Sequence, residues 1–130
     1  MIVATAGTTG AGIIDDLVAL REIAVEQKLW FHTDAAWGGG AILLPEGKKV
    51  LHGIDQSDSI TFDAHKWLSV PMGAGMYLTR HPEILSETCR ITADYMPKEG
   101  AGLDFVDPYS HSMQWSRPMP MVKRPCRHLS

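Results

Sequence analysis

The feature that most constrains this chain is an alternation of short apolar runs with one segment of helical periodicity. Apolar, partly β-branched residues at 2–6 predict a buried strand, and apolar residues then recur at helical spacing up to about Lys28. Two further strands are predicted at 29–35 and 59–63, with a short helix at 45–51 between them. This βαβ pattern predicts an α/β fold with a mostly parallel sheet and flanking helices.

A fourth strand is predicted at 73–79, after a short link through Pro71 and Gly73. Because a parallel crossover needs a dozen or more residues, we expect this one strand to run antiparallel. A helix is predicted to follow at 81–89. At the start of the long helix, either Asp15 or Asp16 can act as the N-cap.

From about residue 91 the regular spacing of apolar residues weakens, and glycine- and proline-containing stretches typical of loops take its place. The stretch 118–130 carries three prolines, which exclude a regular helix or a central strand. We therefore divide the chain into a partial α/β domain at 1–90, a loop-like segment at 91–117 and an aberrant proline-rich tail at 118–130. A frameshift or premature stop would produce such a tail. That hypothesis requires an apolar-periodic helix in the next reading frame of the parent DNA.

Composition excludes several classes of partner. The formal net charge is −3, and the basic residues form no face for nucleic acid or anionic lipid. Two cysteines cannot build a disulfide framework, which fits a reducing, cytoplasmic setting. No apolar run approaches the roughly 20 residues that span a membrane. We expect a cytoplasmic protein without a nucleic-acid or membrane partner.

Polar residues follow the first three predicted strands at the point where each one ends. The segment from Thr5 to Thr9 follows the first strand, Asp34 ends the second, and the group Asp63, His65 and Lys66 ends the third. In open α/β sheets, ligands bind outside the carboxyl ends of the strands. If the strands are parallel neighbours, all three clusters face one crevice.

Asp34 and Lys66 are the candidates for chemistry in this crevice. A carboxylate among apolar residues is costly to bury without a cation, and a protonated pyridine nitrogen is one such partner. A desolvated lysine becomes a nucleophile toward carbonyls, so an imine to an aldehyde cofactor is its natural use. Structural alternatives stay open: Asp34 can cap a turn at the glycine run, and Lys66 can reach from a strand end into solvent.

The other candidate sites rest on fewer signals. His65 can hydrogen-bond an anion or transfer a proton near neutral pH, although a histidine beside an apolar strand is more often structural. The small-residue loop at 7–12 lacks the lysine and the spacing of a phosphate-binding loop. We expect no metal site, because the histidines beyond His32 show no ligand spacing. A Ser-His-Asp triad is unsupported, because no Gly-x-Ser-x-Gly elbow occurs.

Three ordered blocks of sequence resemble one known family. They read ATAGTT at 4–9, HTDAAWGGG at 32–40 and DSITFDAHKW at 58–67. The blocks resemble the group II pyridoxal-phosphate-dependent (PLP-dependent) amino-acid decarboxylases, which include glutamate, aromatic-amino-acid, cysteine-sulfinate and diaminobutyrate decarboxylases. The likeness covers about residues 1–117, and the spacing from Asp34 to Lys66 is the one that the family pattern expects.

The resemblance implies a fold and a role for each matched residue. The fold would be part of the large domain of PLP fold-type I. Lys66 would bind the cofactor covalently, Asp34 would pair with its pyridine nitrogen, and Ala36 would pack on the ring. Thr5 would lie beside the cofactor, and His65 would lie near its phosphate or near the lysine.

Two further positions gain a role only through the resemblance. Tyr95 falls in the segment 91–117, which resembles the family's mobile catalytic loop, and a tyrosine there would protonate the carbanion after carbon dioxide leaves. Asp63 stands where many members carry Asn, so its negative charge on the phosphate side must point away or be bridged. The resemblance also implies an amino-acid substrate and a homodimer in the full-length form.

These implications give one main hypothesis and two alternatives. The main hypothesis is PLP-dependent decarboxylation of an amino acid to the amine and carbon dioxide, by a fragment that is incomplete for activity. The first alternative is an inactive remnant that at most self-associates through an exposed sheet edge. Another PLP enzyme on the same scaffold, such as a carbon–carbon lyase or a desulfurase, is disfavoured by the block at 34–40.

Overall fold

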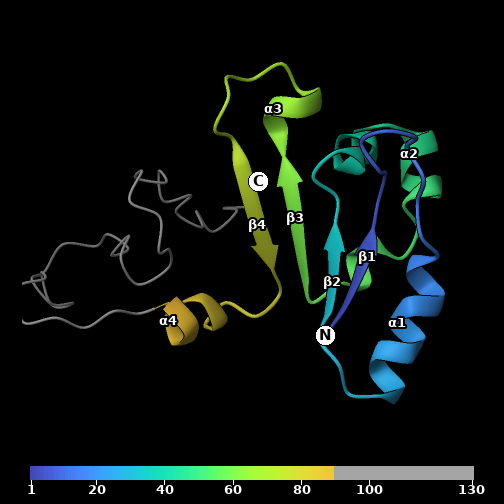
Figure 1. Ribbon diagram of the computed structural model, residues 1–130, viewed down its shortest axis with the longest axis vertical. Coiled ribbons are helices and arrows are strands. Elements are labelled where there is room, and N and C mark those ends of the chain that lie inside the picture. The colour runs from blue at the N-terminus through green and yellow to red at the C-terminus, as the bar shows by residue number, and fades with distance from the viewer. Residues whose placement is uncertain (90–130) are drawn as a thin grey trace, which may run out of the picture. The chain divides into compact units, whose positions relative to one another are not determined.

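The computed structural model describes residues 1–89, which fall into two units, Met1–His81 and a second that begins at Pro82. The first unit carries a four-stranded sheet in the order β1-β2-β3-β4 (Figure 1). Its strands are β1 (Ile2–Thr5), β2 (Phe31–Asp34), β3 (Ser59–Asp63) and β4 (Gly75–Thr79). Its helices are α1 (Leu17–Glu26), α2 (Pro45–Val50) and α3 (Ala64–Trp67), with 3₁₀ turns η1 (Gly38–Leu43) and η2 (Ile54–Gln56). The second unit contributes α4 (Ile84–Cys89).

The pairing of the strands confirms the predicted α/β class. β1 pairs with β2 and β2 pairs with β3 in parallel, whereas β3 and β4 are antiparallel. The link from β3 to β4 is too short to return the chain to the starting end of the sheet, so a parallel fourth strand is excluded. The predicted segments 91–117 and 118–130 lie outside the described residues.

Two aspartates at the start of α1 accept different hydrogen bonds. Asp16 is the N-cap, and its Oδ1 accepts a hydrogen bond from the backbone N–H of Ala19 at 3.0 Å. Asp15 instead accepts a hydrogen bond from the backbone N–H of Thr5 through Oδ2, at 2.7 Å. The helix start is therefore tied directly to the last residue of β1.

Apolar side chains cover one face of the sheet. Ala4 and Phe31 are fully buried against Leu17 and Ala24 of α1. Alternate residues of a strand point to opposite faces, and Val3, the residue before Ala4 in β1, is 52% exposed within the described chain. Among the helices within residues 1–89, none is both long and apolar enough to cross a bilayer.

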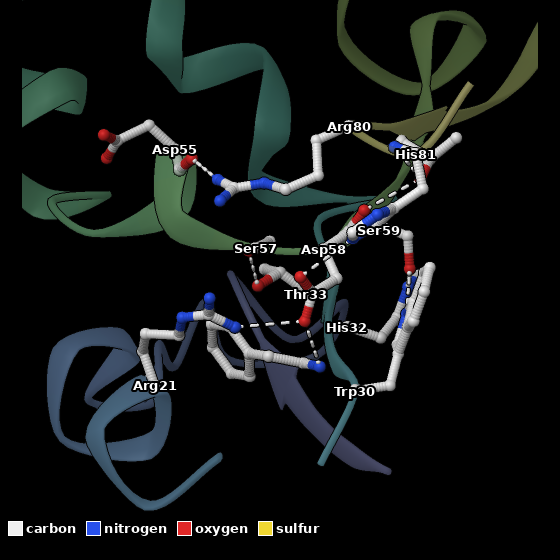
Figure 2. A network of polar contacts seen from close by, with 12 residues as sticks. Arg21, Trp30, His32, Thr33, Asp55, Ser57, Asp58, Ser59, Arg80 and His81 are labelled. Atoms are coloured by element: carbon white, nitrogen blue, oxygen red, sulfur yellow. Dashed lines mark hydrogen bonds and ion pairs between the residues drawn. The ribbon is translucent and has the colours of Figure 1, made fainter. Parts of the chain in front are cut away.

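A polar network joins the amino end of β3 to its surroundings (Figure 2). The carboxylate of Asp58 accepts hydrogen bonds from the backbone N–H of Phe31 at 2.8 Å and from Arg21 Nη1 at 3.0 Å. Its other oxygen lies 3.1 Å from His81 Nε2. Burial alone would raise the pKa of Asp58, but the Phe31 N–H, with His81 and Arg21, holds that pKa below its ordinary value.

Candidate functional site

The polar residues predicted to share a crevice lie at one edge of the sheet. Thr5 is the register partner of Asp34, and Asp34 is the register partner of Thr61, two residues before Asp63. The carboxyl ends of β1, β2 and β3 therefore meet at the same edge, where α3 follows β3 (Figure 1). The predicted juxtaposition of these three strand ends is confirmed.

Backbone hydrogen bonds extend the ladder past the end of β2. The N–H of Ala6 donates to the carbonyl of Asp34 at 2.8 Å, and the N–H of Ala35 donates to the carbonyl of Thr61 at 3.0 Å. These bonds fix the backbone on both sides of Asp34. The site edge is thus a continuation of the sheet rather than a free loop.

Close backbone contact explains why glycine follows β2. A Cβ atom at Gly38 would lie 2.2 Å from the carbonyl oxygen of Ala6, and one at Gly7 would lie 2.9 Å from the Cα of Gly38. Gly7 also has φ +96°, a left-handed conformation that favours glycine. The loop after β1 therefore packs directly on the glycine run after β2.

Asp34 differs from its expected environment. Sequence reasoning placed its carboxylate among apolar residues, but the residue is exposed in the described chain. The reason is the strand alternation: Thr33 points into the core and is fully buried, so Asp34 points away from it. Its Oδ1 accepts a hydrogen bond from the N–H of Ala36 at 3.1 Å, which is the turn-capping role that stayed open above.

Lys66 also differs from expectation, because it has an anionic partner. Its Nζ lies 2.8 Å from Oδ2 of Asp63, and the two side chains are 29% and 19% exposed. Asp63 is the last residue of β3, and the turn of α3 brings the residue three positions later back over it. The lysine predicted to be desolvated is partly buried and ion-paired, and the charge of Asp63 is bridged by it.

His65 holds an unsatisfied polar atom. Its side chain is 16% exposed and its Nε2 lies 4.0 Å from Asp63 Oδ2, beyond hydrogen-bond distance. Its Nδ1 is buried and has no hydrogen-bond partner among residues 1–89. Buried ring nitrogens are normally paired, so a polar ligand group at this sheet edge fits the residues present.

An apolar hollow in the first unit adjoins this edge, because Ala35 and Phe62 are among its lining residues. Its volume is about 280 Å³, and none of the predicted site residues lines it. The lining is apolar throughout and includes Ile42, Ile60, Phe62, Leu68 and Leu78. A phosphate or carboxylate would find no polar partner there. The hollow is therefore no candidate for an anionic cofactor.

Two contributors to this region were missed from the sequence, and Tyr95 lies outside the described residues. Asp15, which binds the backbone of Thr5, was considered only as a helix cap. Gly75 was not considered, yet a Cβ atom there would lie 3.1 Å from Asp63 Oδ1. Strand pairing gives the only signal for Gly75, because it is the register partner of Asp63.

Residues 1–124 match the family model described as the pyridoxal-dependent decarboxylase conserved domain. The chain belongs to this family. It is 42% identical over 116 residues to an aspartate 1-decarboxylase of Aliivibrio fischeri, a match that covers 89% of this chain and 20% of that protein.

Solved structures agree with the family assignment. Mouse CSAD in its apo form matches with a TM-score of 0.68 and 31% identity, covering 76% of this chain and 21% of that one. Oryza sativa TDC with PLP and tryptamine matches with a TM-score of 0.68 and 30% identity, covering 74% and 20%. The chain therefore spans about a fifth of these decarboxylase-family relatives, and its sheet is part of the PLP fold-type I large domain.

Proposed function

We propose that this chain supplies part of the cofactor site of a PLP-dependent amino-acid decarboxylase. The observation that carries the proposal is the shared sheet edge, where Thr5, Asp34 and the Asp63–Lys66 pair end adjacent strands. Ligands of α/β folds bind at such edges. Membership of the pyridoxal-dependent decarboxylase family supports the same reading.

Each residue at this edge has a group suited to one part of the cofactor. Lys66 has the amine that would bond to the aldehyde, and Asp34 has a carboxylate that would keep a proton on the pyridine nitrogen. Ala36 follows Asp34 in the capped turn and would pack on the ring, with Thr5 beside it. The unsatisfied Nδ1 of His65 would contact the phosphate.

When bound, PLP would accept the electron pair that remains on the substrate's α-carbon after carbon dioxide leaves. Asp34 would favour this electron transfer by keeping a proton on the pyridine nitrogen, because a nearby carboxylate stabilises the positive charge of the ring. We assign His65 a role in proton transfer, a chemistry to which an imidazole ring is suited. We assign the final proton transfer to Tyr95.

The substrate class follows from what the relatives share. Their names specify aspartate, aromatic amino acids and 2,4-diaminobutyrate, which differ in side chain but all carry an α-amino and a carboxyl group. We propose an α-amino acid as substrate, a homodimer as the full-length assembly and a cytoplasmic location. The low cysteine content supports the last point.

Absorbance spectroscopy of the purified full chain with added PLP tests this function. We expect a yellow band from covalent attachment, and we expect Lys66→Ala to abolish it. Lys48→Ala is the matched control, because Lys48 is exposed on α2. A band that persists in Lys66→Ala would contradict the assignment. Carbon dioxide release from a panel of amino acids then separates a decarboxylase from an inactive remnant.

A further inference from the structure

We propose that Asp63 is a positioning residue that holds the Lys66 amine at the end of β3 before any cofactor engages it. The inference deepens the proposed function and rests on it, because it assumes that Lys66 is the reactive amine. It goes further by assigning a specific chemical role to the carboxylate that precedes α3.

The contact distances single out Lys66 as the partner of Asp63. Oδ2 of Asp63 lies 2.8 Å from Lys66 Nζ, whereas His65 Nε2, which is charged only when the ring is protonated, is 4.0 Å away. Both members of the pair are partly buried. Partial exclusion of water strengthens such a charge-assisted hydrogen bond relative to one in bulk solvent. The amine therefore lies against the Asp63 carboxylate rather than unpaired in solvent.

Gly75 keeps the carboxylate in this orientation. Asp63 and Gly75 are register partners in the antiparallel pair of β3 and β4. A Cβ atom at Gly75 would lie 3.1 Å from Asp63 Oδ1, closer than ordinary van der Waals contact. The missing side chain of β4 thus makes room for one carboxylate oxygen while the other binds Lys66.

The hold has a chemical consequence for Lys66. An ammonium group donates hydrogen bonds but has no free electron pair, so it cannot attack a carbonyl carbon. A carboxylate at 2.8 Å accepts a hydrogen bond from that ammonium group and so occupies one of its donors. Asp63 must therefore release Nζ before Lys66 reacts, and weakening the pair should raise the reactivity of the free amine.

Competitive acetylation of the cofactor-free full chain tests this without any catalytic readout. The chain is treated with substoichiometric acetic anhydride at neutral pH, and mass spectrometry gives the ratio of modified Lys66 to modified Lys48. We expect Asp63→Asn to raise this ratio severalfold, because the amide has the same shape without the charge. Gly75→Ala should raise it in the same direction by displacing the carboxylate.

Asp55→Asn is the matched control for the loss of one negative charge, because Asp55 is exposed on η2. The ratio of modified Lys66 to modified Lys48 in Asp55→Asn should equal the ratio in the unmodified chain. The melting temperature of Asp63→Asn should also equal that of the unmodified chain. An unchanged ratio in Asp63→Asn would overturn the proposal even if Gly75→Ala fails to fold. Adding PLP to the same samples separates the two hypotheses. A raised ratio without covalent PLP attachment contradicts the proposed function and leaves the Asp63 contact standing.

Discussion

At the scale of single residues, Asp58 links three parts of the first unit. Its carboxylate binds Arg21 of α1, the backbone of Phe31 in β2 and the ring of His81 after β4. The residue is 9% exposed, so loss of its charge would leave several donors without an acceptor. No local pattern predicts this role, because each donor is more than twenty positions away in the sequence.

The lowered pKa of Asp58 gives a signed prediction for stability against pH. Because the folded chain holds this pKa below the ordinary value of 3.8, Asp58 stabilises the fold above that value. The contribution is lost as the pH falls through the folded-state pKa. Asp58→Asn should reduce the free energy of unfolding by about 1–3 kcal/mol at pH 7. It should also flatten the acid limb of the stability curve, which is the fall of that free energy toward low pH. Urea denaturation from pH 7 to pH 3 measures both, and an unchanged acid limb in the variant would contradict the assignment.

Gly38 carries a second prediction at the residue scale. A methyl group there would meet the carbonyl oxygen of Ala6 at 2.2 Å, so the backbone must move. Gly38→Ala should destabilise the chain by about 1–3 kcal/mol and abolish covalent PLP attachment. Gly10→Ala is the control, because a Cβ atom at Gly10 meets nothing within 4 Å. Thermal melting and the yellow band give the two readouts, and equal behaviour of both variants would refute the packing argument.

At the scale of elements, sequence periodicity predicted the strands, the long helix and the antiparallel direction of β4. These follow from local spacing and from the length of the links, both of which are visible in the sequence. The environments of Asp34 and Lys66 were left open by the sequence, which offered a buried and a more exposed alternative for each. Burial depends on which face of the strand is covered, and the partner of Lys66 depends on the turn of α3. Neither quantity can be read from the apolar neighbours of a residue along the chain.

The N-cap of α1 gives a prediction for the stability of this helix. Asp16→Ala removes the acceptor for the Ala19 N–H and should destabilise the chain by about 1 kcal/mol. Glu22→Ala, an exposed position within the same helix, should change stability by less than about 0.5 kcal/mol. Chemical denaturation monitored by circular dichroism compares the two. Equal destabilisation by both variants would show that α1 does not depend on its cap.

At the scale of the whole molecule, the described part of the chain leaves apolar side chains exposed on strands at both edges of its sheet. Val3 of β1 is 52% exposed, and Tyr77 and Leu78 of β4 are 45% and 46% exposed. Each of these strands has a neighbour on one side only. Apolar edge strands are templates for pairing with a second chain. The alternative of a self-associating module therefore rests on a physical feature of the sheet.

This feature predicts association of the isolated chain with a second copy of itself. Sedimentation velocity should show a weight-average mass that rises with protein concentration. Val3→Lys, which places a charge on β1, should reduce that rise, because edge lysines oppose strand pairing. Val25→Lys is the matched control, since Val25 is 59% exposed on α1 and belongs to no strand. If both variants associate as the unmodified chain does, β1 is not the contact, and the β4 edge with Tyr77 and Leu78 becomes the next surface to alter.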